Sequence, residues 1–427
     1  YVRDVEAGGS NPLTPTTIAL DRGSLTIDTA PDRLVAGSPA FRRANVAMFF
    51  GGYASFAMLY ATQPLLPQLA TDFAISAAAS SLAVSAGTAA MAVMLIPASV
   101  LSDRFGRVPL MKGSLVLAAV IATASAAVAD FTQLLVLRAL LGAVLAGLPA
   151  AAMAYLSEEV APDAQGRAMG LYIGGNALGG MSGRFLAALF TDWSSWRMAL
   201  AALGVLGLVA AVVFWRGLPP SRHFRPREAS LGRIARDVRA IASDPGLPWL
   251  FVTGFLLMGT LVGLFNYLPF RLGEAPYHLG HTAIGAIFLL YAVGTWASAF
   301  AGRVADRHGR RNALWVMVAI MGTGLALTLA TPLAGVIAGV AVCTFGFFAS
   351  HSLASGWVGR RAPERPALAS ALYLFAYYVG ASAIGTLAGA AWGVGGWPGV
   401  VAMLGACVLA TLAVALRLRK LQPRVPT

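Results

Sequence analysis

The chain has 427 residues, of which 58% are hydrophobic and only 11% are charged, and its formal net charge is +13. Soluble globular domains are about one quarter charged, so this composition excludes an ordinary soluble protein. The apolar residues lie in long runs with almost no charges, and about 20 such residues in a helix cross the hydrocarbon core of a membrane. The sequence therefore predicts an all-α membrane protein.

Residues 1–43 come first and are polar, with many Pro, Gly, Asp and Arg residues. They contain no apolar core of the kind found in signal peptides, and their composition is typical of disorder. We expect them to form a disordered cytoplasmic tail.

Twelve apolar runs follow, six on each side of one polar segment. This pattern predicts an N-terminal six-helix bundle over 44–215, a linker over 216–247, a C-terminal six-helix bundle over 248–417 and a cytoplasmic tail over 418–427. The predicted membrane-spanning helices cover 44–66, 77–100, 112–129, 131–156, 168–190, 198–215, 248–270, 281–302, 313–329, 333–357, 368–390 and 398–417.

The linker contains the amphipathic stretch LGRIARDVRAIAS. Its apolar residues share one helical face, and its arginines lie on the others. This pattern favours either a helix at the membrane interface, with arginines facing anionic lipid, or a solvated linker helix. The apolar face consists of Leu231, Ile234, Val238 and Ile241.

The basic residues are distributed unevenly among the connections. If the N-terminus is cytoplasmic, 27 of the 31 Lys and Arg residues fall on the cytoplasmic side. Cytoplasmic loops of membrane proteins carry such an excess, which sets orientation during insertion. The net charge is therefore explained by topology without a nucleic-acid partner, and both chain ends are expected in the cytoplasm.

The two halves of the chain resemble each other. The stretch LSDRFGRVPL at 101–110 has a near-copy, VADRHGRRNA, at 304–313, and each joins the second and third predicted spans of its half. Asp103 and Asp306 are 203 residues apart, and Tyr172 and Tyr373 are 201 apart. A nearly constant offset indicates two pseudo-symmetric bundles around a central cavity.

These charged turns resemble the loop signature of the major facilitator superfamily, Gly-x-Leu-Ala-Asp-Arg-x-Gly-Arg-Arg. Ser99 replaces the first glycine and Val108 the last arginine in the first copy, whereas the second copy is fuller. The resemblance implies the major facilitator fold and a secondary transporter that works by alternating access. The matching residues are Asp103, Arg104, Gly106 and Arg107, then Asp306, Arg307, Gly309, Arg310 and Arg311.

A carboxylate in such a turn can accept hydrogen bonds from a helix N-terminus and can pair with arginine. Glycine permits the sharp turn itself. In the family these contacts are understood as a cytoplasmic gate that holds this side shut and breaks when it opens. The alternative is a basic turn that only sets topology.

Arg138 lies inside the fourth predicted span, where a charge is costly and usually faces protein or water. In drug/proton antiporters of the family, an arginine followed four residues later by glycine, here Gly142, is linked to proton transfer. Leu141 stands where a glutamine is common. The alternative is that Arg138 extends its charge to the membrane surface.

The fifth span reads GLYIGGNALGGMSGR and matches the antiporter motif of the family only in part. Gly175, Gly179 and Gly183 recur every four residues and predict close packing against another helix. We expect Arg184, near the outer end of this span, to reach the interface or to meet Asp192.

The resemblance places spans 1, 4, 7 and 10 around the cavity. The cavity residues predicted on these spans and on spans 5, 8 and 11 are Gln63, Arg138, Tyr155, Asn176, Asn266, Tyr291 and Tyr377, with Tyr60, Tyr267, Phe347, Phe348 and His351 as further candidates. Each has the alternative role of packing between helices.

No Asp or Glu lies in the middle of a predicted span. Arginine stays protonated in proteins, so proton coupling would require a water chain, Asp130 or His351. No phosphate-binding loop of the Gly-x-x-x-x-Gly-Lys-Ser/Thr type is present, which argues against direct use of ATP.

The stretches YATQPLLPQLATDF and GNALGGMSGR resemble the bacterial drug and sugar efflux branch of the family. The resemblance implies proton-coupled efflux of a small organic molecule from the bacterial inner membrane. We expect a monomer in the lipid bilayer that is not an enzyme and has no metal, cofactor or nucleic-acid partner. An importer or uniporter and a non-transporting membrane sensor are the alternatives.

Overall fold

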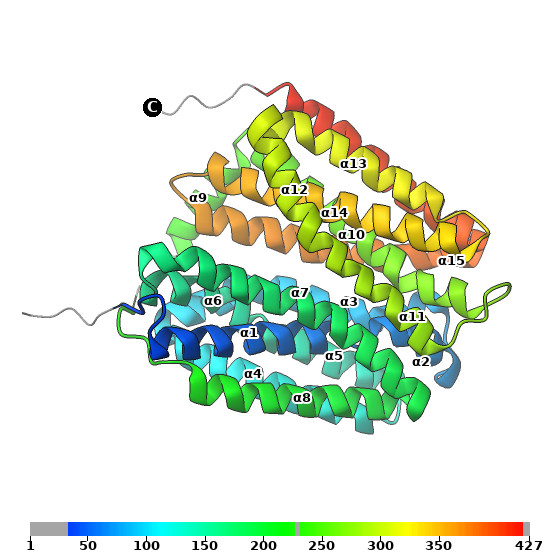
Figure 1. Cartoon of the computed structure of the whole chain (residues 1–427), viewed down its shortest axis with the longest axis horizontal. Coiled ribbons are helices and arrows are strands. Elements are labelled where there is room, and N and C mark those ends of the chain that lie inside the picture. The colour runs from blue at the N-terminus through cyan, green and yellow to red at the C-terminus, as the bar shows by residue number, and fades with distance from the viewer. Residues whose placement is uncertain (1–32, 227–230, 422–427) are drawn as a thin grey trace, which may run out of the picture. The chain divides into compact units, whose positions relative to one another are not determined.

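A computed structural model describes residues 33–226 and 231–421 of the chain. Within these ranges the regular secondary structure is helical, apart from a single β-bridge between Leu34 and Val160, and turns and short loops connect the helices. Figure 1 shows the helices of the first half packed together, with those of the second half beside them. The linker helix lies at one end of the helices, and the connection between α10 and α11 lies at the other.

The first half ends at Gly217 and contains helices that match the first six predicted spans. Local breaks divide three of these spans: the first corresponds to α1 with η1 and the start of α2, the third to α4 with η2, and the fourth to α5 with α6. The second span is α3 alone. The elements are α1 (Pro39–Tyr60), η1 (Gln63–Leu65), α2 (Leu66–Asp72), α3 (Ala77–Phe105), α4 (Arg107–Ala124), η2 (Ser125–Ala127), α5 (Phe131–Leu145), α6 (Gly147–Glu159), α7 (Pro162–Trp193) and α8 (Trp196–Gly217).

The linker contributes α9 (Leu231–Ala242), and the second half follows it. The elements of the second half are α10 (Leu247–Gly273), α11 (His281–Ile287), η3 (Phe288–Ala292), α12 (Val293–His308), α13 (Arg310–Leu327), α14 (Leu333–Arg361) and α15 (Pro366–Arg419).

The last helix, α15, contains two predicted spans with no polar loop between them. Its backbone leaves helical geometry at Gly395 and Gly396, and Gly396 has φ +54°, a conformation that favours glycine. Eight helical ranges of the described chain, α15 among them, are long and apolar enough to cross a membrane. The helices α1, α7 and α13 have 22, 32 and 18 residues and occupy the other predicted positions.

The outward faces of the helices are apolar. On α8, Val205, Val209 and Val212 are each about half exposed, and they follow one another at helical spacing. A soluble protein rarely exposes so extended an apolar surface, whereas lipid is a suitable solvent for it. By contrast, α10 lies centrally. In its most apolar stretch of 18 residues, 67% is buried inside the protein, against 33% in the corresponding stretch of His281–His308, which includes α12.

The internal repeat is visible in how the helices pack. A β-carbon at Gly179 on α7 would overlap the carbonyl oxygen of Tyr53 on α1, and a β-carbon at Gly380 on α15 would overlap that of Phe255 on α10. The two helix pairs are therefore built alike, at sequence offsets of 201 and 202 residues. Gly175 and Gly183 face α1 in the same way, which places the predicted glycine strip in a close helix contact.

Two predicted boundaries require correction. The expected disordered tail over 1–43 is too long, because Leu34 donates a 2.7 Å hydrogen bond to the Glu159 carbonyl and α1 begins at Pro39. Ser38 caps that helix through a 3.1 Å bond from the Phe41 amide. The final helix likewise continues to Arg419. The remaining tail residues, 1–32 and 422–427, lie outside the described residues.

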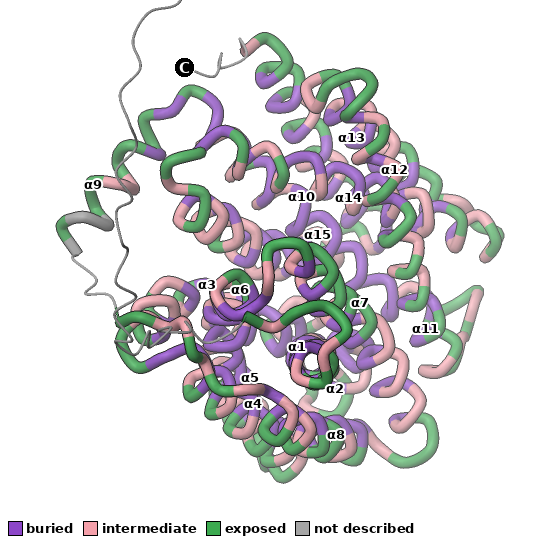
Figure 2. The backbone as a smooth tube through the Cα atoms, turned by 60° about the vertical axis from the view of Figure 1, so that its left-hand side comes forward, coloured by how far each residue is buried: buried purple, intermediate pink, exposed green. Residues whose placement is uncertain are grey.

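The linker helix α9 has the amphipathic character that its sequence predicts. Figure 2 shows it mostly exposed or half-buried, while Ile241 is buried and Arg236 and Arg239 are exposed. The side chains of Leu231 and Ile234 lie outside the described residues.

Candidate functional site

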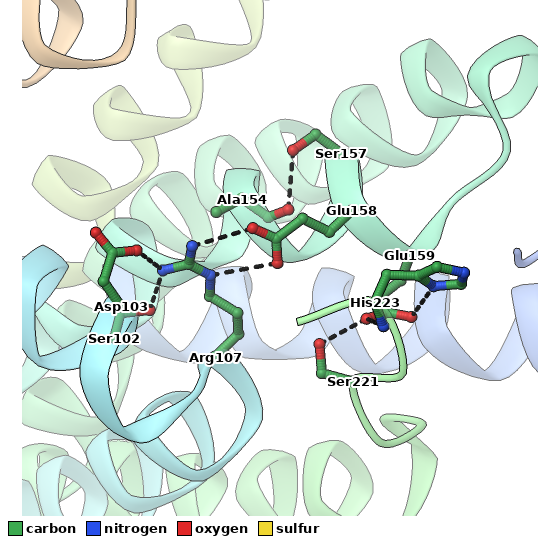
Figure 3. A network of polar contacts seen from close by, with 9 residues as sticks. All are labelled: Ser102, Asp103, Arg107, Ala154, Ser157, Glu158, Glu159, Ser221 and His223. Carbon is green, nitrogen blue, oxygen red and sulfur yellow. Dashed lines mark hydrogen bonds and ion pairs between the residues drawn. The ribbon is translucent and has the colours of Figure 1, made fainter. Parts of the chain in front are cut away.

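The two charged turns lie at the same end of the helices as the linker, and we call this the charged-turn end. In the first turn, Arg107 pairs with Asp103 and donates to Ser102 Oγ at 3.0 Å and to Glu158 Oε1 at 3.0 Å (Figure 3). Gly106, with φ +102°, makes the turn between α3 and α4 possible. Arg107 is 5% exposed and therefore ties α3, α4 and α6 together inside the first half.

The start of the linker is attached to the same half. Glu159 accepts hydrogen bonds from Ser221 Oγ at 2.6 Å and from the His223 amide at 2.9 Å, and its other oxygen lies 2.9 Å from His223 Nδ1 (Figure 3). Tyr155, a predicted cavity residue, donates nearby to the Pro219 carbonyl at 3.0 Å. Its hydroxyl thus fixes the chain after α8 rather than entering the interface between the halves.

The second turn is arranged differently from the first. Gly309, with φ +79°, again makes the turn, and Arg311 bonds the Leu421 carbonyl beyond α15. Within residues 33–226 and 231–421, Asp306 forms no ion pair or hydrogen bond. Arg104 and Arg307 are exposed at the corresponding positions of the two turns. The near-copies in sequence therefore differ in the contacts that they make.

The far end of the linker is attached to the second half. Arg365 pairs with Asp237 of α9 at 2.7 Å, and Arg361 pairs with Asp244. Asp244 also accepts the Gly246 and Leu247 amides at 2.8 and 2.9 Å, which caps α10. Burial alone would raise the pKa of the Asp244 carboxyl, but the bonds from Arg361 and these amides lower it below its ordinary value.

All these charged contacts stay within one half or join the linker to one half. Across the two described ranges, no hydrogen bond or ion pair at the charged-turn end links the first half directly to the second. The predicted gate residues Asp103 and Arg107 do bridge neighbouring helices. In this structure, however, they do not hold the halves against each other.

At the opposite end, polar groups join the two halves. Gln63 Nε2 donates to Asn266 Oδ1 at 2.8 Å, and both side chains are fully buried. These residues are 203 apart, which is also the offset between the charged turns, so the internal repeat brings equivalent positions into contact.

A second set of hydroxyl groups links α3 to α15 across the halves. Ser85 Oγ lies 2.7 Å from Thr386 Oγ1, and Thr88 Oγ1 lies 2.7 Å from Ser382 Oγ. Ser382 also donates to the Ser85 carbonyl at 3.1 Å. Nothing in the sequence distinguished these hydroxyls from the many other small polar residues of the spans.

Asp192, at the end of α7, caps a helix of the other half. It accepts the His281 amide at 3.2 Å and the Thr282 amide at 2.6 Å, at the start of α11. The N-cap residue of α11 is Gly280, which has no side chain to do this. The first half thus supplies the cap that the second half lacks.

Arg184 neither reaches the membrane interface nor meets Asp192, so this expectation was wrong. It is 2% exposed, donates to Gln63 Oε1 at 2.6 Å and bonds the Gly180 carbonyl. Its guanidinium carbon lies 4.1 Å from the ring centre of Tyr60 and 4.9 Å from that of Tyr291. Cation–π contacts and hydrogen bonds draw the side chain inwards instead.

Arg138 is also buried, with 1% of its surface exposed, and so does not extend to the membrane surface. It donates to the carbonyl oxygens of Ala83 at 3.0 Å and Met58 at 2.9 Å, and it also bonds that of Leu59. The guanidinium therefore joins the end of α1 to α3 through backbone acceptors. The close contact of Gly142 with Gly87 brings α5 near enough to α3 for this.

An aromatic cluster in the second half continues from Tyr291 towards the charged-turn end. His351 stacks on Phe347 with ring centres 5.8 Å apart, and its Nδ1 lies 2.9 Å from the Tyr373 hydroxyl. Tyr377 lies 4.8 Å from the His351 ring.

Asn176, another predicted cavity residue, lies on α7 of the first half, beside Gly52 of α1. The described residues contain no cluster of three His, Cys, Asp or Glu side chains suited to a metal.

Comparisons with known proteins agree with this architecture. Residues 48–382 match the family model of the Major Facilitator Superfamily. The chain is 43% identical to the MFS-type transporter YybF of Bacillus subtilis (strain 168), over 88% of this chain and 93% of that protein. It is 42% identical to the inner membrane transport protein YnfM of Escherichia coli (strain K12), over 94% and 96%.

Solved structures with the same fold are more distant in sequence. A bacterial homologue of the human lysosomal transporter Spinster, in an inward-facing and unoccupied conformation, matches with a TM-score of 0.72 at 15% identity, over 90% of this chain and 96% of that one. The nucleoside transporter NupG matches with a TM-score of 0.73 at 14% identity, over 88% and 99%.

Proposed function

Because the chain belongs to the major facilitator superfamily of membrane transporters, we propose that it exports a small organic molecule in exchange for protons. It works as a monomer in the bacterial inner membrane, by alternating access between its two halves. Neither a metal nor another cofactor takes part, and the proton gradient drives the cycle.

The observation that carries this proposal is the uneven distribution of contacts between the halves. Polar contacts such as Gln63–Asn266 and Asp192–Thr282 join the halves at one end. At the charged-turn end, the described ion pairs remain within a half or on the linker. Such an arrangement suits a state that is closed on one side of the membrane and accessible from the other.

The charged-turn end is the cytoplasmic one in this proposal. With the N-terminus on this side, 27 of the 31 Lys and Arg residues fall here, and cytoplasmic loops are enriched in such residues. The structure then corresponds to an inward-facing state with both chain ends in the cytoplasm. The name of the related inner membrane transport protein supports the same membrane.

We assign proton coupling to His351. Imidazole is the side chain whose ordinary pKa lies nearest to neutral pH, and His351 lies within α14 among Phe347, Tyr373 and Tyr377. Its 2.9 Å contact with the Tyr373 hydroxyl responds to protonation, because Nδ1 of a neutral imidazole can accept a hydrogen bond whereas a protonated imidazole can only donate one. His351→Gln is expected to slow gradient-driven efflux at least about tenfold, while the exposed control His308→Gln leaves it intact.

The test of the function is a substrate screen in a host that lacks its major efflux pumps. Cells that express the chain should accumulate less of a transported compound than cells with an empty vector, and a protonophore should abolish the difference. Inverted vesicles with an imposed proton gradient then give the direction of movement. Higher accumulation in expressing cells, or movement that ignores the gradient, would contradict proton-coupled export.

A further inference from the structure

Arg184 is a buried cation without a buried anion beside it. It is 2% exposed, and within the described ranges no Asp or Glu pairs with it. An arginine in this setting is unfavourable unless hydrogen bonds and a counter-charge compensate it. Gln63, the Gly180 carbonyl and the surrounding rings supply partial compensation but no negative charge.

Three hydrogen-bond donors around this cation are unused in the described part of the chain. The Nε and Nη1 atoms of Arg184 have acceptors, whereas Nη2 has none. The hydroxyls of Tyr60 and Tyr291 are buried, without partners, on the two rings that flank the guanidinium. Buried polar groups are nearly always paired, so two buried unpaired hydroxyls beside a guanidinium nitrogen without an acceptor indicate that an acceptor belongs there.

The internal repeat shows that the fold does not require this cation. The position equivalent to Arg184, at the offset of 201 that relates Gly179 to Gly380, is Gly385. The partners correspond as well, since Arg184 contacts Gln63 while the Gly385 carbonyl accepts a 3.4 Å bond from Asn266. The second half makes the equivalent helix contact with Gly385 in place of an arginine. We therefore infer that Arg184 serves a purpose other than packing.

The three donors also lie where both halves meet. Arg184 and Tyr60 belong to the first half, and Tyr291 and Phe288 belong to the second. Tyr291 packs on Phe348, with ring centres 5.6 Å apart, and the aromatic cluster continues from there to His351. A molecule with one negatively charged end and an apolar body would match this arrangement, with its charge at Arg184 and its apolar part along the aromatic residues.

We propose that Arg184, with the hydroxyls of Tyr60 and Tyr291, forms a subsite for the carboxylate group of a small organic anion, whose apolar part lies against the aromatic cluster. A carboxylate can accept a charge-assisted bond from the unused Nη2 of Arg184 and has lone pairs left for the two phenols. The proposal rests on the transport function and specifies its substrate class. It also explains how the substrate contacts both halves at once.

The experiment measures thermal unfolding of the purified full-length chain in detergent at constant chloride. The probes are carboxylates, each paired with its neutral amide: phenylacetate with phenylacetamide, cinnamate with cinnamamide, and hexanoate with hexanamide. At saturating concentration at least one carboxylate should raise the melting temperature by about 2 °C or more, because a ligand that binds only the folded state stabilises it. Its amide should not.

The variants separate recognition from general stability. Arg184→Gln should abolish the shift, and Arg184→Lys should retain part of it. Arg197→Gln, on an exposed arginine of α8 that stacks on Trp196, should leave it unchanged. If Arg184→Gln fails to fold, the double variant Tyr60→Phe, Tyr291→Phe keeps the cation and should weaken carboxylate binding about tenfold, with Tyr155→Phe as the matched control.

The subsite is refuted if no carboxylate shifts the melting temperature, if amides act equally, or if Arg184→Gln responds like the parent chain. It is also refuted if sodium chloride alone produces the same Arg184-dependent shift, because the site would then hold an inorganic ion. A neutral or cationic compound identified in the efflux screen would refute the subsite while leaving transport intact. Carboxylate binding at Arg184 without gradient-linked movement would support the subsite and contradict the proposed transport.

Discussion

The two ends of this transporter are held by different kinds of contact. At the charged-turn end, ion pairs such as Arg107–Glu158 and Arg361–Asp244 join helices within a half or fix the linker to it. At the opposite end, mostly uncharged groups join one half to the other, as in the pair Gln63–Asn266. Strong contacts therefore make each half rigid, and weaker ones connect the halves.

This division suits a protein whose halves move as units. A neutral hydrogen bond contributes about 0.5–1.5 kcal/mol, and bonds to charged groups about 1.5–3 kcal/mol. Contacts that form and break in every cycle need to be weak enough to separate, whereas those within a half need to persist. The carboxylate that joins the halves at the opposite end, Asp192, binds backbone amides rather than an arginine.

The largest expected effect comes from a wedge between the halves at the opposite end. A β-carbon at Gly285 on α11 would lie 2.5 Å from the Ala188 methyl group on α7, so Gly285→Val forces these helices apart. Overpacking of this kind costs about 1–3 kcal/mol, and transport should fall at least about tenfold. Spin-label distances across the opposite end should lengthen.

Gly405→Val is the matched control, because nothing lies within 4 Å of a β-carbon there. Its transport and distances should resemble those of the parent chain. An equal loss in both variants would mean that the wedge acts through general instability and not through the contact between the halves.

The next effect compares the two charged turns. Asp103→Asn removes one charged partner of Arg107, whose remaining partner Glu158 is on another helix. At equal expression, transport should fall about five- to tenfold, in line with one charged hydrogen bond lost at a partly exposed site. Asp306→Asn should change it less than about twofold, because no ion pair of Asp306 occurs in the described part of the chain. Unchanged transport in Asp103→Asn would discredit the gate, and equal losses would show that the turns act alike.

A smaller effect is expected at the hydroxyl contacts of the opposite end. Ser382→Ala removes the bond to Thr88 and the bond to the Ser85 carbonyl, both between the halves. The closed state should lose about 0.5–1.5 kcal/mol, seen as a higher population of long distances across that end. Ser355→Ala removes a bond within α14 alone and should leave the distances as they are. If both serines behave alike, the hydroxyls do not connect the halves.

The smallest effect concerns pH and the linker. The Asp244 carboxyl has a pKa below its ordinary value of 3.8, so its ionised form stabilises the fold at every pH above about 4. This stabilisation is lost as the pH falls from 3.8, the ordinary pKa, through the lower pKa of the folded state, where the carboxylate becomes protonated. Between about pH 5 and 3, Asp244→Asn should therefore melt with a shallower pH dependence than the parent chain. Asp163→Asn, on an exposed residue of α7, should follow the parent.

Much of the fold could be predicted because apolar run length and polar interruptions are local properties. The two spans of α15 were separable from Gly395, Gly396 and Pro398, and the predicted position of α10 agrees with its observed bounds to within three residues. The charged turns were equally visible, since Asp103 and Asp306 stand out in apolar surroundings. What they contact was not visible, because Glu158 comes from a helix 51 residues away.

The contacts between the halves were mostly hidden. Arg184 precedes Asp192 by eight residues and so shares its helical face, which made a pairing reasonable, but the decisive partner Gln63 lies on another helix. Ser, Thr and Ala pack alike inside spans, so Ser382 carried no distinguishing pattern. One signal was overlooked: Gln63 and Asn266 repeat at the same offset of 203 residues as the charged turns.

The uncharged character of the contacts around Gln63 and Asn266 has a consequence for the surroundings in which the carrier can work. Dissolved ions screen exposed charges over about 10 Å at 0.1 M ionic strength but have little influence on buried neutral hydrogen bonds. The face proposed to meet the exterior can therefore stay closed in dilute or saline water alike. Sensitivity to electrolyte is expected mainly at the charged-turn end, which is the face proposed to meet the interior of the cell.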